Sequence, residues 1–153
     1  MKKALLILCM AICCLSCKST NQVTGTTTVG GSLPMYSSEN IEPFLDITEV
    51  SKDASYGYSE KNPIKIGGGF SSGARNEKRY FASLAGPNGE TVHFVRLGSC
   101  CGYESENATL GGIALLDKYE LTYEGLKKPL IFYISLYDEE KAFVPKGLIP
   151  RKN

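Results

Sequence analysis

Apolar and polar residues alternate most clearly in the C-terminal half of the chain. In YELTY, residues 119–123, tyrosine and leucine alternate with glutamate and threonine, which is the period of a half-buried strand. After EGLKK, the run PLIFYISLY at 129–137 is apolar or aromatic on both faces. We therefore predict a hairpin whose second strand lies centrally in a sheet. One face of that strand should carry Leu130, Phe132, Ile134 and Leu136.

Two more strands and one helix follow from local pattern and turn residues. TVHFVRL at 91–97 comes after the turn GPNG at 86–89, and NPIKIG at 62–67 is a fourth strand. Over residues 74–85 the apolar positions recur at helical spacing, and the glycine and proline that follow end the pattern. Together these elements predict an α+β fold, a small single domain over residues 41–153 with a mainly antiparallel sheet and one short helix.

The N-terminus has the pattern of an export signal. Two lysines precede an apolar run, Ala4–Leu15, that is too short to span a bilayer. The run ends in CLSC, where the small Ser16 precedes Cys17. This resembles the lipobox of bacterial lipoproteins, and it implies a signal peptide over residues 1–16 and fatty acylation, as with palmitate, at Cys17. The alternative is an ordinary signal peptide that is cut nearby and leaves Cys17 as a thiol.

The segment after Cys17 predicts a tether. Residues 18–40 are rich in Ser, Thr, Gly and Asn and have almost no periodic apolar residues. We therefore expect residues 17–40 to comprise the acylated cysteine and a flexible linker. Lys18 lacks the acidic character of an inner-membrane retention signal. The predicted location is the cell envelope, anchored in the outer membrane, with the folded domain outside the cytoplasm.

Charge does not indicate a nucleic-acid partner. The chain has 17 basic and 16 acidic residues, so loss of Lys2 and Lys3 leaves one more acidic than basic side chain. The basic residues are interleaved with carboxylates, as on an ordinary solvated surface. We expect a membrane partner through the N-terminal lipid, an envelope protein, peptide or glycan as a further partner, and no cofactor.

Export would leave one adjacent pair of cysteines. Of six cysteines, three leave with the signal peptide and Cys17 is acylated, so Cys100 and Cys101 remain in RLGSCCGYES. A trans peptide holds neighbouring α-carbons about 3.8 Å apart, below the usual disulfide range that begins near 4.4 Å. Free thiols are prone to oxidation outside the cytoplasm. Three interpretations stay open: inert packing, a disulfide between neighbours, and a metal-binding or catalytic thiol pair.

The metal and thioredoxin interpretations lack partners. His93 is the only histidine, and the chain has neither CxxC nor HxxxH spacing. A site of both cysteines, His93 and a carboxylate such as Asp117 is conceivable, but no motif indicates it. We predict no metal ligands.

A glycine-rich segment is a candidate anion site. In IKIGGGFSSGARNEKRY, backbone N–H groups near Gly68, Gly69 and Gly73 could hold a phosphate or carboxylate, with Arg75 as the supporting cation. The spacing GxxxxG is that of a P-loop, but Ala74 and Arg75 stand where a P-loop requires lysine and then serine or threonine. The alternative is a connection that only lets the backbone turn.

No arrangement predicts catalysis by serine or by paired carboxylates. Ser99, Glu104 and Glu106 are polar residues of the expected loop from Gly98 to Gly112. We predict no catalytic residues. An aromatic surface for a sugar or peptide is a second possibility, although tyrosines at this spacing more often pack within a sheet. Its members would be Tyr119, Tyr123, Tyr133 and Tyr137.

Several segments resemble a family of small, uncharacterised bacterial lipoproteins across nearly the whole folded region. They are YGYSEKNPIKIGGG, NEKRYFASLAGPNGE, RLGSCCGY, LLDKYELTYEGLKKPLIFYISLYD and VPKG. Members often have proline and an aromatic residue after the paired cysteines, where this chain has Gly102 and Tyr103. Some relatives carry the label 2-dehydro-3-deoxyphosphooctonate aldolase. We do not transfer it, because that enzyme is a cytoplasmic TIM barrel and such barrels need about 250 residues.

Two classes of function follow from these observations. The first is a lipid-anchored binding or envelope-assembly module that recognises its partner through a sheet face or the loop from Gly98 to Gly112. The second is a thiol-dependent redox enzyme or sensor centred on Cys100 and Cys101. The balance favours a protein that is not an enzyme.

Overall fold

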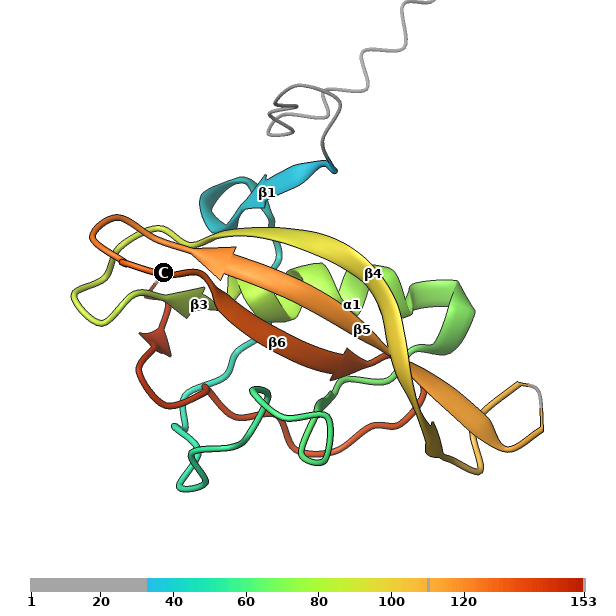
Figure 1. Ribbon diagram of the computed structural model, residues 1–153. Coiled ribbons are helices and arrows are strands. Elements are labelled where there is room, and N and C mark those ends of the chain that lie inside the picture. The colour runs from blue at the N-terminus through green and yellow to red at the C-terminus, as the bar shows by residue number, and fades with distance from the viewer. Residues whose placement is uncertain (1–32, 110, 153) are drawn as a thin grey trace, which may run out of the picture.

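Five strands form the main sheet in the order β1–β4–β5–β6–β2 (Figure 1). The computed structural model describes residues 33–109 and 111–152. Neighbouring strands are antiparallel, except that β2 and β6 are parallel. The strands span Met35–Ser37 (β1), His93–Glu104 (β4), Ile113–Thr122 (β5), Leu130–Ser135 (β6) and Ile64–Lys65 (β2). With one α-helix among the described residues, this confirms a small single α+β domain with a mainly antiparallel sheet.

The predicted C-terminal hairpin is confirmed as β5 and β6. Tyr119 of β5 lies opposite Phe132 of β6, and both are buried. Ile134 faces the same way as Phe132, two residues along, as the strand period requires. β6 lies between β5 and β2, so its apolar character on both faces fits an interior strand.

The helix, α1, spans Gly69–Ala82 and packs against one face of the sheet (Figure 1). It begins and ends earlier than the range 74–85 that its apolar pattern predicts. It begins at the glycines because Gly68, with φ of 100°, supplies the left-handed turn before the first helical residue. It ends before β3 (Leu84–Ala85), which pairs with β7 (Ile149–Pro150) in a second, two-stranded sheet.

The core lies between α1 and the sheet. It is aromatic: Phe81 of α1 has its ring centroid 4.6 Å from Tyr119 and 5.2 Å from Phe94. Loops on the β2 and β6 side close the same core, since the Tyr58 ring lies 4.7 Å from Phe132. The largest fully buried apolar side chains are Tyr80, Tyr119, Phe81, Phe94, Phe132, Ile64, Leu84, Leu116, Leu121, Ile134 and Val92.

The boundary of the folded domain differs from the prediction. The composition predicts a linker up to residue 40, but β1 pairs with β4 at residues 35–37 and a 3-10 helix follows at Ser38–Asn40. Tyr36 explains the difference, because its ring stacks on Phe94 at 5.7 Å and adds to the core. The folded region therefore includes residues that lack any strand periodicity of their own.

The region from Gly98 to Gly112 also differs from the prediction. It is not a long loop, because β4 continues to Glu104 and β5 begins at Ile113, so the two strands form a hairpin arm (Figure 1). Of the described residues between the two strands, 106–107 and 111–112 lie in turns. The predicted strand at 91–97 is thus the first part of a longer one.

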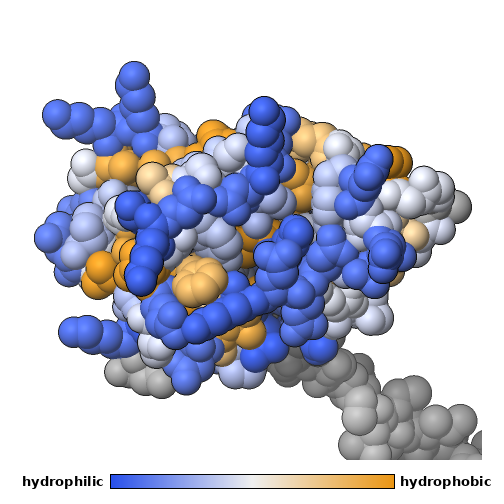
Figure 2. Space-filling view, turned by 90° about the horizontal axis from the view of Figure 1, so that it is seen from below, coloured by the Kyte–Doolittle hydropathy of each residue, from blue (hydrophilic) through white to orange (hydrophobic). Residues whose placement is uncertain are grey.

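The predicted signal peptide, Cys17 and most of the linker lie outside the described residues. Within residues 33–109 and 111–152, no helix combines the length and the apolar character that a membrane span requires. On the face seen in Figure 2, many hydrophilic side chains project from the surface, and apolar patches lie among them and at the edges.

Candidate functional site

The sulfur atoms of Cys100 and Cys101 are joined in a disulfide bond on β4. Cys100 lies opposite Leu116 of β5, whereas Gly102 lies opposite Leu115, so Cys101 is the extra residue of a β-bulge. Cys101 has φ of 49°. The bulge allows two side chains that would alternate across a regular strand to meet. Both cysteines are half-buried, so they are not core residues.

The residues considered for a metal site are not brought together. His93 lies at the first position of β4 and pairs with Ser37 and Thr122, whereas the cysteines lie near the other end of the strand. The Asp117 carboxylate is already bound by neighbouring side chains. Among the residues that the structure describes, no group of three or more His, Cys, Asp or Glu side chains could hold a metal ion.

The candidate anion residues do not converge on one loop. The Gly69 N–H donates to the Leu136 carbonyl, so it is not free for a ligand. Gly73 lies in the helix and faces the sheet, where a Cβ atom would come within 2.5 Å of the Leu136 Cβ. This glycine permits close packing of α1 on the chain after β6. The Arg75 side chain is exposed on the helix surface.

Of the four tyrosines considered as an aromatic surface, Tyr119 and Tyr137 line one cleft, which is described below, but the four do not form a single surface. Tyr119 is buried on the face of the sheet that α1 covers. Tyr133 is half-buried, lies one residue from Phe132 on β6 and therefore faces the opposite way. Tyr119 therefore packs within the sheet, as the alternative interpretation of these tyrosines predicts.

A cleft of about 480 Å³ opens where the first turns of α1 meet β4 and β5. We call it the α1–sheet cleft. Its walls are mostly apolar or aromatic and come from segments that are distant in the sequence. They are Leu33, Pro34, Tyr36, Phe70, Ala74, Leu115, Leu136 and Tyr137, and the remaining lining residues are Lys78, Arg96, Ser99, Asp117 and Tyr119.

Exposed apolar side chains gather at this cleft. Phe70 is 74% exposed, and its ring meets Tyr137 edge to face with centroids 5.8 Å apart. Leu33 and Leu115 also line the cleft and are about half exposed. Ile113 precedes Leu115 by two residues and faces the same side of β5. Large exposed hydrophobic groups that gather in this way mark interaction surfaces, whereas scattered ones do not.

The polar part of the cleft, its floor, is a hydrogen-bonded cluster of Arg96, Ser99 and Asp117. Arg96 of β4 donates from Nε and Nη2 to the two carboxylate oxygens of Asp117 of β5, both at 2.6 Å. Ser99 accepts from the same Nη2 at 2.6 Å and donates to Asp117 at 2.8 Å. The paired carboxylate raises the pKa of Arg96 above its usual value. A bidentate pair of this kind fixes both side chains and leaves little net charge on the floor.

A buried carboxyl group lies close to the floor. Glu77 of α1 is fully buried and accepts a hydrogen bond from the Tyr119 hydroxyl at 2.9 Å. Its second oxygen, Oε1, has no hydrogen-bond partner within the described structure. Burial first, and then the nearby negative charge of Asp117, raises the pKa of Glu77 to about 8. Glu77 is therefore mostly protonated and neutral at pH 7.

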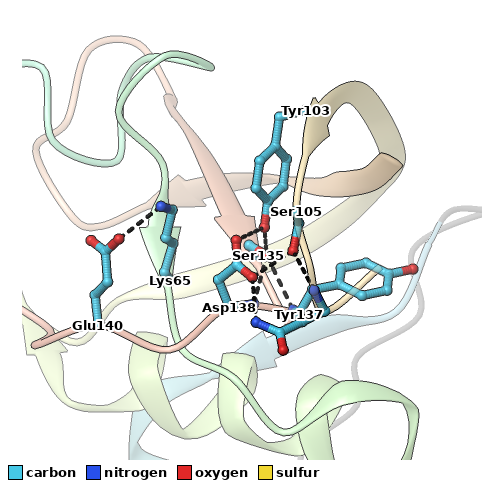
Figure 3. Close-up of polar contacts among 8 residues, drawn as sticks. Lys65, Tyr103, Ser105, Ser135, Tyr137, Asp138 and Glu140 are labelled. Carbon is cyan, nitrogen blue, oxygen red and sulfur yellow. Dashed lines mark hydrogen bonds and ion pairs between the residues drawn. The ribbon is translucent and has the colours of Figure 1, made fainter. Parts of the chain in front are cut away.

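A second polar cluster ties the hairpin arm to the body of the domain (Figure 3). Tyr103, Ser105 and Asn107 of the arm donate to the Asp138 carboxylate at 2.8, 2.6 and 2.8 Å. Burial opposes ionisation of Asp138, but these hydrogen bonds prevail and lower its pKa. Tyr103 also bonds Ser135 at 2.5 Å. The Asp138 carboxylate therefore joins the hairpin arm to the chain that follows β6. We call Tyr103, Ser105, Asn107 and Asp138 the latch.

Comparison with known proteins does not identify a function for this chain. No family model, no curated protein and no solved structure matches the chain. Sequence reasoning missed Phe70, Glu77, Arg96 and Leu115 as site residues. No local pattern indicates them, because these residues come together only when α1 packs on the sheet.

Proposed function

We propose that this chain is a lipid-anchored protein of the bacterial cell envelope that recognises another envelope component through the α1–sheet cleft. The N-terminal pattern that ends at Cys17 supports the anchor. One observation carries the binding role. Three exposed apolar side chains, Leu33, Phe70 and Leu115, surround a cleft whose polar floor is already organised.

The cleft fits recognition better than catalysis. Apolar walls provide binding energy through burial, and a few fixed polar groups provide orientation. Arg96 and Asp117 neutralise each other, and Glu77 is buried and neutral at pH 7. The floor holds no nucleophile paired with a base, because Ser99 donates its hydroxyl to a carboxylate that Arg96 already holds.

Accessibility measurements test this function even while the partner is unidentified. Phe70→Cys and Val50→Cys each place a thiol at an exposed apolar position, and Val50 lies outside the cleft. In isolated envelopes, we expect a water-soluble maleimide to label the Phe70→Cys protein several-fold more slowly than it does after purification. The Val50→Cys protein should react equally fast in both states. Ala74→Cys, an exposed position in the same cleft that keeps Phe70, is labelled in parallel. Equal labelling of both cleft variants in the two states would exclude a bound partner at the cleft.

The same cells test the anchor. Grown with a labelled fatty acid, they should incorporate label into the wild-type chain and into Cys14→Ser, but not into Cys17→Ser. Label that persists in Cys17→Ser would contradict acylation at this position.

A second candidate function rests on the bond between Cys100 and Cys101. The bonded pair is partly accessible and stands at the base of the arm, between Ser99 of the cleft floor and Tyr103 of the latch. Reduction by a dithiol would transfer two electrons and two protons, which yields two thiols here and a disulfide on the reductant. Reduction would leave two half-buried thiols at the bulge of β4. The pair would act as a redox sensor.

Intact mass of the mature protein tests the redox candidate. A mild dithiol should add about 2 Da, the mass of the two hydrogens gained, and expose two thiols to alkylation. The double variant Cys100→Ser, Cys101→Ser should show neither change. Two thiols that alkylate before any reductant is added would contradict a bonded pair and remove the redox function.

A further inference from the structure

We infer that the envelope component bound at the α1–sheet cleft is the lipid bilayer itself, with Phe70, Leu33 and Leu115 inserted among the lipid headgroups. This inference rests on the proposed function, because it requires the acyl anchor. It names the partner of the same surface and fixes how the domain is oriented on the membrane.

The position of the tether is the first argument. The described chain begins at Leu33, which lines the cleft. It continues within two residues into β1, whose place in the sheet is seen in Figure 1. About 16 residues separate Leu33 from Cys17, and a chain of that length reaches at most roughly 55 Å when fully extended. Leu33 is therefore the point at which the tether joins the described part of the domain. The cleft opens at that position.

The distribution of exposed apolar residues is the second argument. A soluble surface has little reason to expose a phenylalanine to 74% on the first turn of a helix. Phe70 shares the cleft with Leu33 and Leu115, so the apolar rim coincides with the tethered end. The face seen in Figure 2 also has apolar patches, but hydrophilic side chains project among them.

Charge is the third argument. Lys78 lines the cleft, with its ammonium 4.4 Å from the centroid of the Tyr36 ring, and Arg75 is exposed on the same helix. Asp117, the carboxylate that lines the cleft, is neutralised by Arg96. A rim of apolar side chains with Lys78 beside it, and without an unpaired carboxylate from Asp117, suits a surface of anionic phospholipid headgroups.

Tryptophan fluorescence tests this orientation, because the chain contains no tryptophan. Phe70→Trp provides a single reporter at the cleft, and Val50→Trp provides a matched reporter at an exposed apolar position outside it. The full acylated protein is reconstituted into vesicles of phosphatidylethanolamine and phosphatidylglycerol. Brominated acyl chains in these lipids quench a tryptophan that enters the headgroup and acyl boundary. Iodide in the buffer quenches one that stays in water.

We expect brominated lipid to reduce emission from Phe70→Trp at least about twofold, as for a ring that lies at the acyl boundary, and to leave Val50→Trp unchanged. Iodide should quench emission from Val50→Trp more strongly than emission from Phe70→Trp. Equal behaviour of the two variants would overturn the inference. So would a Phe70→Trp signal that resists both quenchers, since a protein surface or a second copy would then cover the cleft.

The same vesicle experiment distinguishes a failure of the proposed function from a failure of the lipid inference alone. If the chain does not remain in the vesicles and the N-terminal peptide lacks acyl mass, the anchor is absent and both proposals fall. If acylation and maleimide protection hold but brominated lipid does not quench Phe70→Trp, only the lipid partner is overturned.

Discussion

Replacing Phe81 with alanine is expected to lower the free energy of unfolding by about 3–5 kcal/mol. Phe81 is fully buried in α1, and its ring centroid lies within 5.8 Å of the ring centroids of Tyr80, Phe94, Tyr119 and Phe132. These rings come from the helix and three strands, so the truncation leaves a cavity that no single neighbour can fill. Small domains have only about 5–15 kcal/mol of stability, so the variant should be largely unfolded in mild denaturant.

Urea unfolding followed by far-ultraviolet circular dichroism measures this effect. Phe70→Ala is the matched control, because it makes the same substitution in the same helix at a side chain that is 74% exposed. That change should alter stability in water by no more than about 0.5 kcal/mol. Similar losses in both variants would contradict the packing of α1 described above.

Replacing Glu77 with glutamine is expected to raise the free energy of unfolding at pH 7 by up to about 3 kcal/mol. In the folded chain, burial and the charge of Asp117 raise the pKa of Glu77 from 4.5 to about 8. The unfolded chain ionises freely at pH 7, so folding has to return a proton to this side chain. Glutamine has nearly the same shape, still accepts from Tyr119 and carries no such cost.

The sign of the pH dependence follows from the same shift. Between about pH 4.5 and pH 8 the folded state binds a proton at Glu77 that the unfolded state does not bind. Stability contributed by this group is therefore full below pH 4.5 and falls as the pH rises towards 8. The Glu77→Gln variant should lack this component, so its advantage over the wild type should grow with pH and level off near pH 8.

Unfolding curves at several pH values test this expectation. Glu106→Gln is a control, because Glu106 is exposed in the turn of the hairpin arm. It should leave the pH dependence of the wild type intact. A Glu77→Gln variant with unchanged pH dependence would mean that Glu77 is already ionised in the folded protein at neutral pH.

Strand periodicity predicts the β5–β6 hairpin correctly because both strands bury one face against the helix. Helical periodicity places the start of the helix at residue 74, not 69, because Gly73 faces the core but does not count as apolar. Glu77 faces the core as well, although it is a charged residue type. A glycine is needed there for close approach to Leu136, and the buried glutamate bonds Tyr119. Hydrophobic pattern alone has no signal for either requirement.

Periodicity does not predict β1 for a related reason. Three residues are too few to show a period, and Met35–Ser37 becomes a strand because β4 offers a free edge and Phe94 offers a ring for Tyr36 to stack on. The hairpin arm has the sequence pattern of a loop because glycines and two bulges interrupt β4. Pairing with β5 maintains the strand across these interruptions.

The amino-acid sequence by itself determined the fold class, the central hairpin and the adjacency of Cys100 and Cys101, because these depend on local spacing. It also provides the whole basis for the predicted export and acylation. The tertiary structure decided which side chains form the cleft, since Leu33, Phe70, Arg96 and Leu115 meet only after the helix packs on the sheet. It also decided that the two cysteines meet, because a bulge in β4 depends on its register with β5. Contacts between distant segments leave no periodic trace in the chain, and for that reason the recognition surface could not be predicted from the sequence.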